Sequence, residues 1–155
     1  MVRSVSAEKQ REYDELKRFF VHWETHLTPQ RVLGLEHPHN PINVLAVYER
    51  QLGVSRVLPG LKQAVNDILE DFGDFSPQQI AAADASLAGA GAPTMSQLWQ
   101  RRSRHYKALL RRGRLRNDTE YYLASSIVCD TASPVPPNEL DLLDRMVANY
   151  ELQRT

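Results

Sequence analysis

A run of cations carries the clearest chemical potential in this sequence. Residues 94–116 hold eight Lys and Arg residues and no Asp or Glu. At about 100° per residue, most of these cations fall opposite the apolar side of a helix. Such a face can engage an acidic protein surface or nucleic-acid phosphates. The partner-binding residues that we predict are Arg101, Arg104, Lys107, Arg111, Arg114, Arg116 and Tyr122.

The same run also fits the end of one helix and the start of the next. Arg111 and Arg112 suit the negative end of a helix dipole on a solvated face, and Gly113 suits a left-handed C-cap. Asn117 suits an N-cap, and Glu120 suits the positive end of the following helix. These cap assignments explain most of the pattern without any ligand.

The acidic start of the second helix argues against sequence-specific DNA reading. In a helix-turn-helix, the second helix contacts bases with its N-terminal residues. Here those residues would include Asp118 and Glu120, which repel phosphates. Non-specific binding of nucleic acid by the first helix stays as the alternative function. Arg114 and Arg116 serve neither cap, which makes them the first positions to mutate.

Arg102 differs from the other cations because it falls within the apolar arc, between Trp99 and Tyr106. A buried guanidinium requires acceptors, so we expect a buried charge paired with a carboxylate on a neighbouring helix. The functional alternative is that Arg102 lines a pocket for an anionic ligand.

Two histidines, His22 and His26, have a spacing that can hold a metal ion. The segment is not the zinc-protease motif, which requires a glutamate directly after the first histidine. No carboxylate or cysteine clearly completes a ligand set, so we predict no metal and no cofactor. A metal-dependent enzyme or metal-binding protein using His22 and His26 remains a further alternative.

No other motif assembles an active site, so no catalytic residue is predicted. The glycines around Ala90 follow a helix and lack the Lys-Ser/Thr of a phosphate loop. Cys129 is followed by Asp130, whose charge does not favour a thiolate. As the single cysteine, it excludes an internal disulfide and a thiolate zinc cluster.

The elements that must position these residues are helices, because apolar residues recur at three- and four-residue spacing. Ser6 and Thr28-Pro29 bound the first, and Gly53 and Gly73 end the second and third. Val54–Leu58 is expected to be a loop. The helices that we predict cover residues 7–28, 42–52, 61–72, 77–87, 94–112, 117–129 and 140–150.

The predicted fold is all-α: one domain over residues 1–155, with about six to seven amphipathic helices packed mostly as antiparallel neighbours. Residues 118–152 form a C-terminal helix pair, joined by a Pro-rich connector at 133–137. The 155 residues carry a formal net charge of zero. With no secretory signal and no apolar run of membrane-spanning length, we expect a cytoplasmic protein with no membrane partner.

Residues 115–151, about a quarter of the chain, carry a pattern of capping, apolar and acidic residues, namely Leu115, Asn117, Glu120, Tyr121, Ala124, Glu139, Leu140, Leu143, Tyr150 and Glu151. This pattern resembles the helical segment at the start of HigA-type antitoxins. The match covers residues 115–151, and a helix-turn-helix domain follows this segment in that family. The resemblance implies a toxin-neutralising or regulatory partner role and transfers no functional residue.

Together these features predict a small bacterial-type cytosolic module that binds a macromolecule through the basic hairpin. A protein with an acidic surface is the favoured partner, because the chain as a whole has no excess of positive charge. Self-association through the oppositely charged halves is a further possibility.

Overall fold

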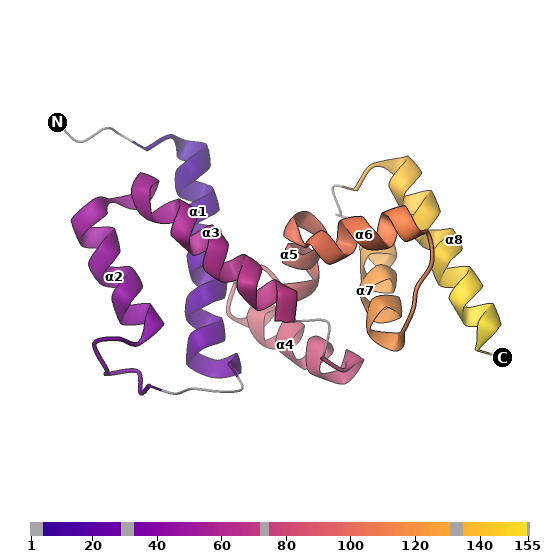
Figure 1. Cartoon of the computed structure of the whole chain (residues 1–155), viewed down its shortest axis with the longest axis horizontal. Helices are drawn as coiled ribbons and strands as arrows, with labels where there is room; N and C mark the ends of the chain where they lie inside the picture. The colour runs from indigo at the N-terminus through magenta and orange to yellow at the C-terminus, as the bar shows by residue number, and fades with distance from the viewer. Residues whose placement is uncertain (1–4, 29–32, 72–74, 131–134, 155) are drawn as a thin grey trace. The chain divides into compact units, whose positions relative to one another are not determined.

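The computed structural model describes residues 5–28, 33–71, 75–130 and 135–154, and within them the chain is all-helical. The all-α fold class is therefore confirmed (Figure 1). These ranges contain eight α-helices rather than six to seven, because the predicted helix over 94–112 is two helices. Pro29, Gly73, Ser133 and Pro134, which the sequence assigned to helix ends and the connector, lie outside the described residues.

Most helices are separated by a few residues, and a longer segment, residues 28–40, separates η1 from α2. They are α1 (Ala7–His22), the π-helical turn η1 (Trp23–Leu27), α2 (Pro41–Leu52), α3 (Val54–Glu70), α4 (Pro77–Gly89), α5 (Met95–Arg102), α6 (Arg104–Arg112), α7 (Asp118–Cys129) and α8 (Pro137–Gln153). No helix in the described part of the chain is long and apolar enough to cross a membrane.

The chain divides into two compact units. Unit 1 comprises residues 1–68 and 85–94, and unit 2 comprises residues 69–84 and 95–155. Each unit buries apolar side chains of its own, and each contains one of the two tryptophans, Trp23 in unit 1 and Trp99 in unit 2. The single domain over residues 1–155 stays a prediction.

The helix starts follow the capping chemistry expected from the sequence. The Ser6 hydroxyl accepts from the Lys9 amide at 3.2 Å, and the Asn117 side chain accepts from the Glu120 amide at 2.8 Å. Ser76 accepts from the Gln79 amide at 3.1 Å. Each side chain thereby satisfies an amide that has no partner inside its own helix.

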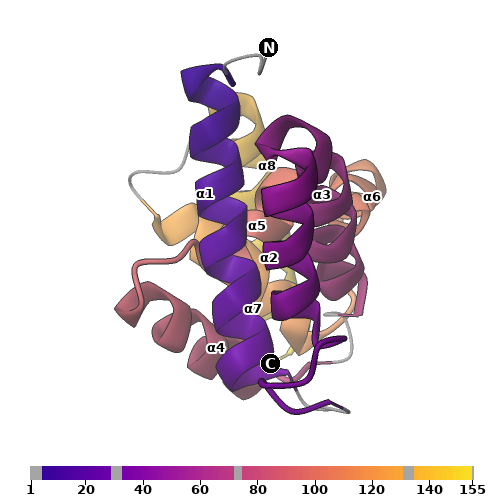
Figure 2. The same ribbon diagram turned by 90° about the vertical axis from the view of Figure 1, so that its left-hand side faces the viewer.

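In unit 1, α1 and α2 lie side by side, and α3 crosses α1 obliquely in Figure 1 and lies next to α2 in Figure 2. Oε2 of Glu49 on α2 accepts from the Tyr13 hydroxyl at 2.8 Å and from Lys17 Nζ at 2.7 Å, and both donors lie on α1. Lys62 on α3 pairs with Glu12 at 3.2 Å. The apolar side chains that these helices and η1 bury include Leu16, Phe19, Phe20, Trp23, Leu45, Val57, Leu58, Leu61 and Val65.

Val54–Leu58 is helical, so the predicted loop is wrong. Gly53 has φ 80°, which lets the chain turn between α2 and α3 within a single residue. Val57 and Leu58 are then buried in unit 1, at 7% and 4% exposure. This burial outweighs the weak helix preference of valine, and α3 also contains Pro59.

In unit 2, α7 and α8 make the most extensive contact, α5 packs on α6 and α7, and α6 contacts α8. Trp99 and Tyr106 meet edge to face, with ring centroids 5.3 Å apart. The Tyr106 hydroxyl donates to Glu139 at 2.8 Å, joining α6 to α8. The other apolar side chains buried in unit 2 include Ile80, Met95, Leu98, Leu109, Leu123, Ala124, Ile127, Leu143 and Met146.

The predicted helix over residues 94–112 is interrupted at Ser103. This residue is extended, with φ −77° and ψ 135°, and its hydroxyl caps α6 by accepting from the His105 amide at 3.0 Å. At the start of α5, the Asp84 carboxylate accepts from the Ser96 amide and hydroxyl at 3.2 and 2.5 Å. A helix therefore ends and another begins between Arg102 and Arg104, where the apolar periodicity alone shows no stop.

Candidate functional site

The exposed face of α6 carries three cations in register. Arg104, Lys107 and Arg111 are all exposed and lie at positions i, i+3 and i+7, on one side of the helix. Within residues 75–130 and the other described ranges, none of the three forms an ion pair. We call these three residues the basic stripe. Tyr106 and Leu109 are buried on the opposite face and fix its orientation.

The two arginines at the end of α5 have different environments. Arg101 is exposed and Arg102 is half-buried, and both side chains interact with other parts of the chain. The Nε atom of Arg102 is buried, consistent with a position facing the interior of unit 2. Pairing of Arg102 with a carboxylate stays a prediction.

The arginines of the turn after α6 converge on one carboxylate. Arg112 Nη2 lies 2.6 Å from Glu120 Oε1, and the Arg116 backbone amide donates to the same oxygen at 2.6 Å. The Arg116 guanidinium lies 3.7 Å from Oε2 of Glu120. The solvated position predicted for Arg112 is therefore wrong, because its side chain is held against α7. Arg116 also serves the start of α7, contrary to expectation.

Arg114 and Tyr122 are less engaged. Arg114 is exposed, and its carbonyl accepts from Nε of Arg112 at 3.0 Å, so its backbone belongs to the turn while its guanidinium faces solvent. Tyr122 is half-buried on α7. Arg114 and the three residues of the basic stripe are thus exposed cations, whereas Tyr122 is partly covered.

The two candidate metal ligands on α1 and η1 lie close together. The rings of His22 and His26 have centroids 4.8 Å apart, and His22 Nε2 lies 2.7 Å from the Ser86 hydroxyl on α4. Burial, and then the neighbouring His26, lower the pKa of His22. Within the described ranges, no group of three or more His, Cys, Asp or Glu residues could hold a metal ion. The hydrogen bond with Ser86 joins His22 to α4.

The tyrosines of α7 and α8 hold the C-terminal helix pair together. Tyr121 and Tyr150 stack with ring centroids 5.2 Å apart. The Tyr121 hydroxyl donates to Glu151 at 2.5 Å, and the Tyr150 hydroxyl donates to Asp118 at 2.6 Å. These reciprocal bonds raise the pKa of both tyrosines. Tyr121, Tyr150 and Glu151, which belong to the antitoxin pattern, thus stabilise the contact between α7 and α8.

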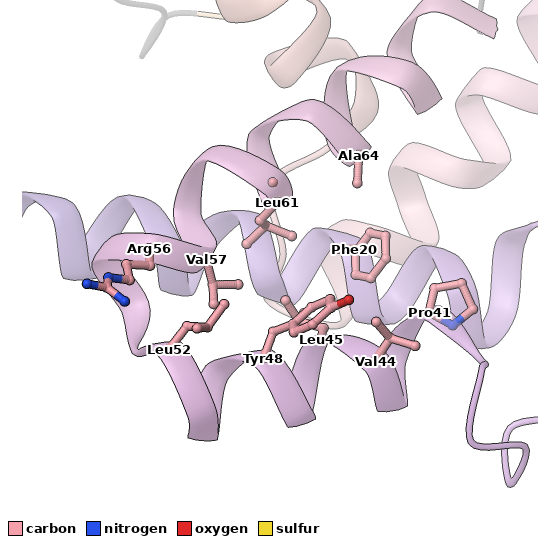
Figure 3. Close-up of a pocket in the computed structure, with 11 residues that line it drawn as sticks. Phe20, Pro41, Val44, Leu45, Tyr48, Leu52, Arg56, Val57, Leu61 and Ala64 are labelled. Atoms are coloured by element: carbon pink, nitrogen blue, oxygen red, sulfur yellow. The ribbon is translucent and has the colours of Figure 1, made fainter.

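An apolar groove between α2 and α3 in unit 1 was not anticipated from the sequence. It has a volume of about 330 Å³. Figure 3 shows side chains of α2 and α3 facing each other across it, with Phe20 of α1 between them. Its lining residues are Phe20, Pro41, Val44, Leu45, Tyr48, Leu52, Arg56, Val57, Gly60, Leu61 and Ala64.

The groove leaves large apolar side chains in contact with solvent. Tyr48 is 49% exposed and Leu52 is 46% exposed, whereas Leu45 on the same helix is 8% exposed. The spacing of these residues was visible in the sequence as an amphipathic face. That spacing identifies the face but not how much of it a neighbouring helix covers, so the groove could be found only in three dimensions.

No family model, no curated protein and no solved structure matches this chain.

Proposed function

We propose that this protein is a binding module that engages an acidic surface of a partner protein through the basic stripe. The carrying observation is that Arg104, Lys107 and Arg111 share one exposed face without ion pairs among the residues described. Exposed charges of one sign accelerate association with an oppositely charged surface and select against like-charged partners. Arg101 and Arg114 extend the same charge at either end of α6.

The number of exposed cations favours a protein partner over nucleic acid. Affinity for the phosphate backbone rises with the number of phosphates that a protein neutralises, and a protein with about six to ten such contacts loses about 10³–10⁵-fold in affinity between 50 and 200 mM salt. The basic stripe offers three cations, and Arg101 and Arg114 raise the total to five. Glu120 partly neutralises Arg112 and Arg116, which the nucleic-acid alternative would also require.

Binding of two labelled probes to the full-length protein tests the proposal. The probes are a Glu-rich helical peptide and a random DNA duplex, titrated by fluorescence anisotropy between about 50 and 200 mM salt. We expect the triple substitution R104E/K107E/R111E to weaken peptide binding at least about tenfold. The matched control R11E/R18E/R50E changes the net charge equally and is expected to leave peptide affinity nearly unchanged.

Two results would contradict the proposal. Equal losses in both triple variants would show that net charge alone attracts the peptide. Tight binding of the duplex near physiological salt, without peptide binding, would assign the stripe to nucleic acid instead.

A toxin is the narrower partner class that the antitoxin resemblance implies. Support for it is confined to the residues of 115–151 that fit the antitoxin pattern. If a neighbouring gene encodes a growth-arresting protein, co-expression of this chain should restore growth, and the R104E/K107E/R111E variant should not. Unchanged growth arrest with the wild-type chain would rule out this toxin as the partner.

The packing of neighbouring helices, the location of the protein and its self-association are also part of this proposal. We infer mostly antiparallel neighbours within each unit, because Gly53 alone joins α2 to α3 and a short turn joins α6 to α7. The location that we propose is cytoplasmic. Self-association of oppositely charged regions would appear as a larger hydrodynamic size at low salt than at high salt.

A further inference from the structure

We propose that the groove between α2 and α3 binds an amphipathic helix of a partner protein and that Arg56 pairs with a carboxylate near one end of that helix. This site goes beyond the proposed function, because it belongs to unit 1 and shares no residue with the basic stripe. The inference rests on the length of the groove, its lining and its charge.

The groove has the length of a short helix. Its lining residues on α2 run from Pro41 to Leu52, and the rise of an α-helix makes this span about 16 Å. That is about three helical turns. A docked helix therefore has room for apolar anchors at positions i, i+4 and i+7, the pattern used by helices that bind in grooves.

The lining supplies two apolar walls. Val44, Tyr48 and Leu52 come from α2, and Val57, Leu61 and Ala64 come from α3. The high exposure of Tyr48 and Leu52 means that a docked apolar side chain would remove substantial apolar area from water. Burial of such area stabilises a complex by roughly 25 cal/mol per Å² before the costs of association.

Gly60 opens the α3 side of the groove. A Cβ atom built at this position has no heavy atom within 4 Å, so free space lies over the backbone. A partner helix can approach this stretch of α3 closely, because no side chain stands there. The same free space means that a larger residue at position 60 would project without disturbing unit 1.

The charge of the groove selects the partner. Arg56 is the charged residue among those lining it, and it lies at the same end as Leu52 and Val57 (Figure 3). Arg56 is exposed and forms no ion pair within the described parts of unit 1. The first turn of α3 contains no acidic residue to offset the positive end of the helix dipole. This end therefore favours a carboxylate and disfavours a lysine or arginine.

The openness of the groove favours a helix over a small amphiphile. Small-molecule sites enclose about 70–90% of their ligand. Here Tyr48 and Leu52 remain about half exposed, so one side of any occupant would stay in water. An amphipathic helix meets that condition, because its polar face requires solvent.

Selection of helical peptides on the full-length protein tests the site. The probe is a display library of helical peptides, and the selected sequences are then titrated individually by fluorescence anisotropy. We expect selected peptides to share apolar residues at i, i+4 and i+7 and an Asp or Glu near one end. Gly60→Leu should weaken their binding at least about tenfold, whereas Gly60→Ala should retain it.

A charge exchange identifies the role of Arg56. Arg56→Glu should lose affinity for a selected acidic peptide and regain it when the acidic residue of the peptide is changed to Lys. Leu52→Lys gives a second block at an exposed position, should Gly60→Leu alter the fold by circular dichroism. R104E/K107E/R111E should bind the peptide like the wild type, which separates this site from the basic stripe.

Several outcomes would overturn the proposal. These are a selection that yields no binding peptide, selected peptides that bind Gly60→Leu and Leu52→Lys as well as the wild type, or peptides with a basic end. Displacement of a selected peptide by laurate, with laurate the tighter ligand, would assign the groove to a small amphiphile. Dimerisation that Leu52→Lys abolishes would assign it to a second copy of this chain.

Discussion

Arg112 Nη2 lies 2.6 Å from Glu120 Oε1, and this ion pair joins the last turn of α6 to the first turn of α7. The two side chains are only 20% and 13% exposed. The Arg116 amide donates to the same oxygen, so one carboxylate closes the whole turn. The change from arginine to acid in the sequence therefore reflects the contact of Glu120 with Arg112 and the Arg116 amide, which we call the clasp. The exposed cations of α6 take no part in the clasp and remain available for binding.

The first prediction concerns the stability of this clasp. Glu120→Ala removes the acceptor of both Arg112 and the Arg116 amide, and we expect it to lower the free energy of unfolding by about 2 kcal/mol. Arg116→Ala should cost less than about 1 kcal/mol, because its guanidinium is 60% exposed and lies 3.7 Å from the carboxylate. Urea denaturation followed by circular dichroism measures both. Equal costs for the two variants would contradict the central role of Glu120.

The second prediction concerns acid stability in unit 1. The hydrogen bond from Lys17, with a smaller one from Tyr13, holds the pKa of Glu49 below its ordinary value of 4.5. A carboxylate with a depressed pKa stabilises the fold at higher pH, and that contribution is lost as the pH falls below 4.5 through the folded pKa. Glu49→Gln should cost about 1 kcal/mol at neutral pH.

Urea denaturation from neutral pH down to acid checks this prediction. The difference between wild type and Glu49→Gln should shrink as the pH falls below 4.5. Gln51, an exposed residue on the same helix, gives a control in Gln51→Ala, which should show no such pH dependence. A constant difference between wild type and Glu49→Gln at every pH would oppose the assigned ion pair.

The third prediction concerns His22. Burial lowers its pKa below 6.5, so the folded chain favours the neutral ring. Because the unfolded chain then binds the proton more readily, stability falls as the pH drops below 6.5 towards the folded pKa. His22→Gln can still bond Ser86 but cannot titrate. We expect the wild type to lose more stability than His22→Gln between neutral and mildly acidic pH, as measured by thermal denaturation.

The fourth prediction compares the same substitution at two glycines. Gly60 lies inside α3 with free space where a Cβ atom would stand, so Gly60→Ala should stabilise the fold by about 0.5–1 kcal/mol. Gly113 ends α6 with φ 75°, and Gly113→Ala should destabilise it by about 1 kcal/mol. Chemical denaturation of both variants should show opposite shifts in midpoint. Shifts of the same sign would contradict one of the two backbone assignments.

Capping chemistry and apolar periodicity were sufficient to predict most helices. The side chains of Ser6 and Asn117 cap helices as expected, because N-capping depends on residues within one turn. The start of α3 was missed because Val54, Val57 and Pro59 have weak helix preferences. Only burial in three dimensions compensates for these preferences.

The candidate sites were predictable to a lesser degree. The helical projection at about 100° per residue placed Arg104, Lys107 and Arg111 on one exposed face, as observed, because α6 is regular across them. It could not place Arg112, whose environment depends on how the chain returns through the turn to Glu120. The groove depends on how closely α2 and α3 approach, a distance set by packing rather than by the spacing of apolar residues.

The placement of the two tryptophans gives each unit its own optical reporter. Trp23 stacks on Phe19 in unit 1, and Trp99 packs against Tyr106 in unit 2. Trp99→Phe leaves fluorescence from unit 1, and Trp23→Phe leaves fluorescence from unit 2. Coincident denaturation curves from the two variants would describe one cooperative fold, and separated curves would describe two. The same pair of variants would report which unit a bound partner protects.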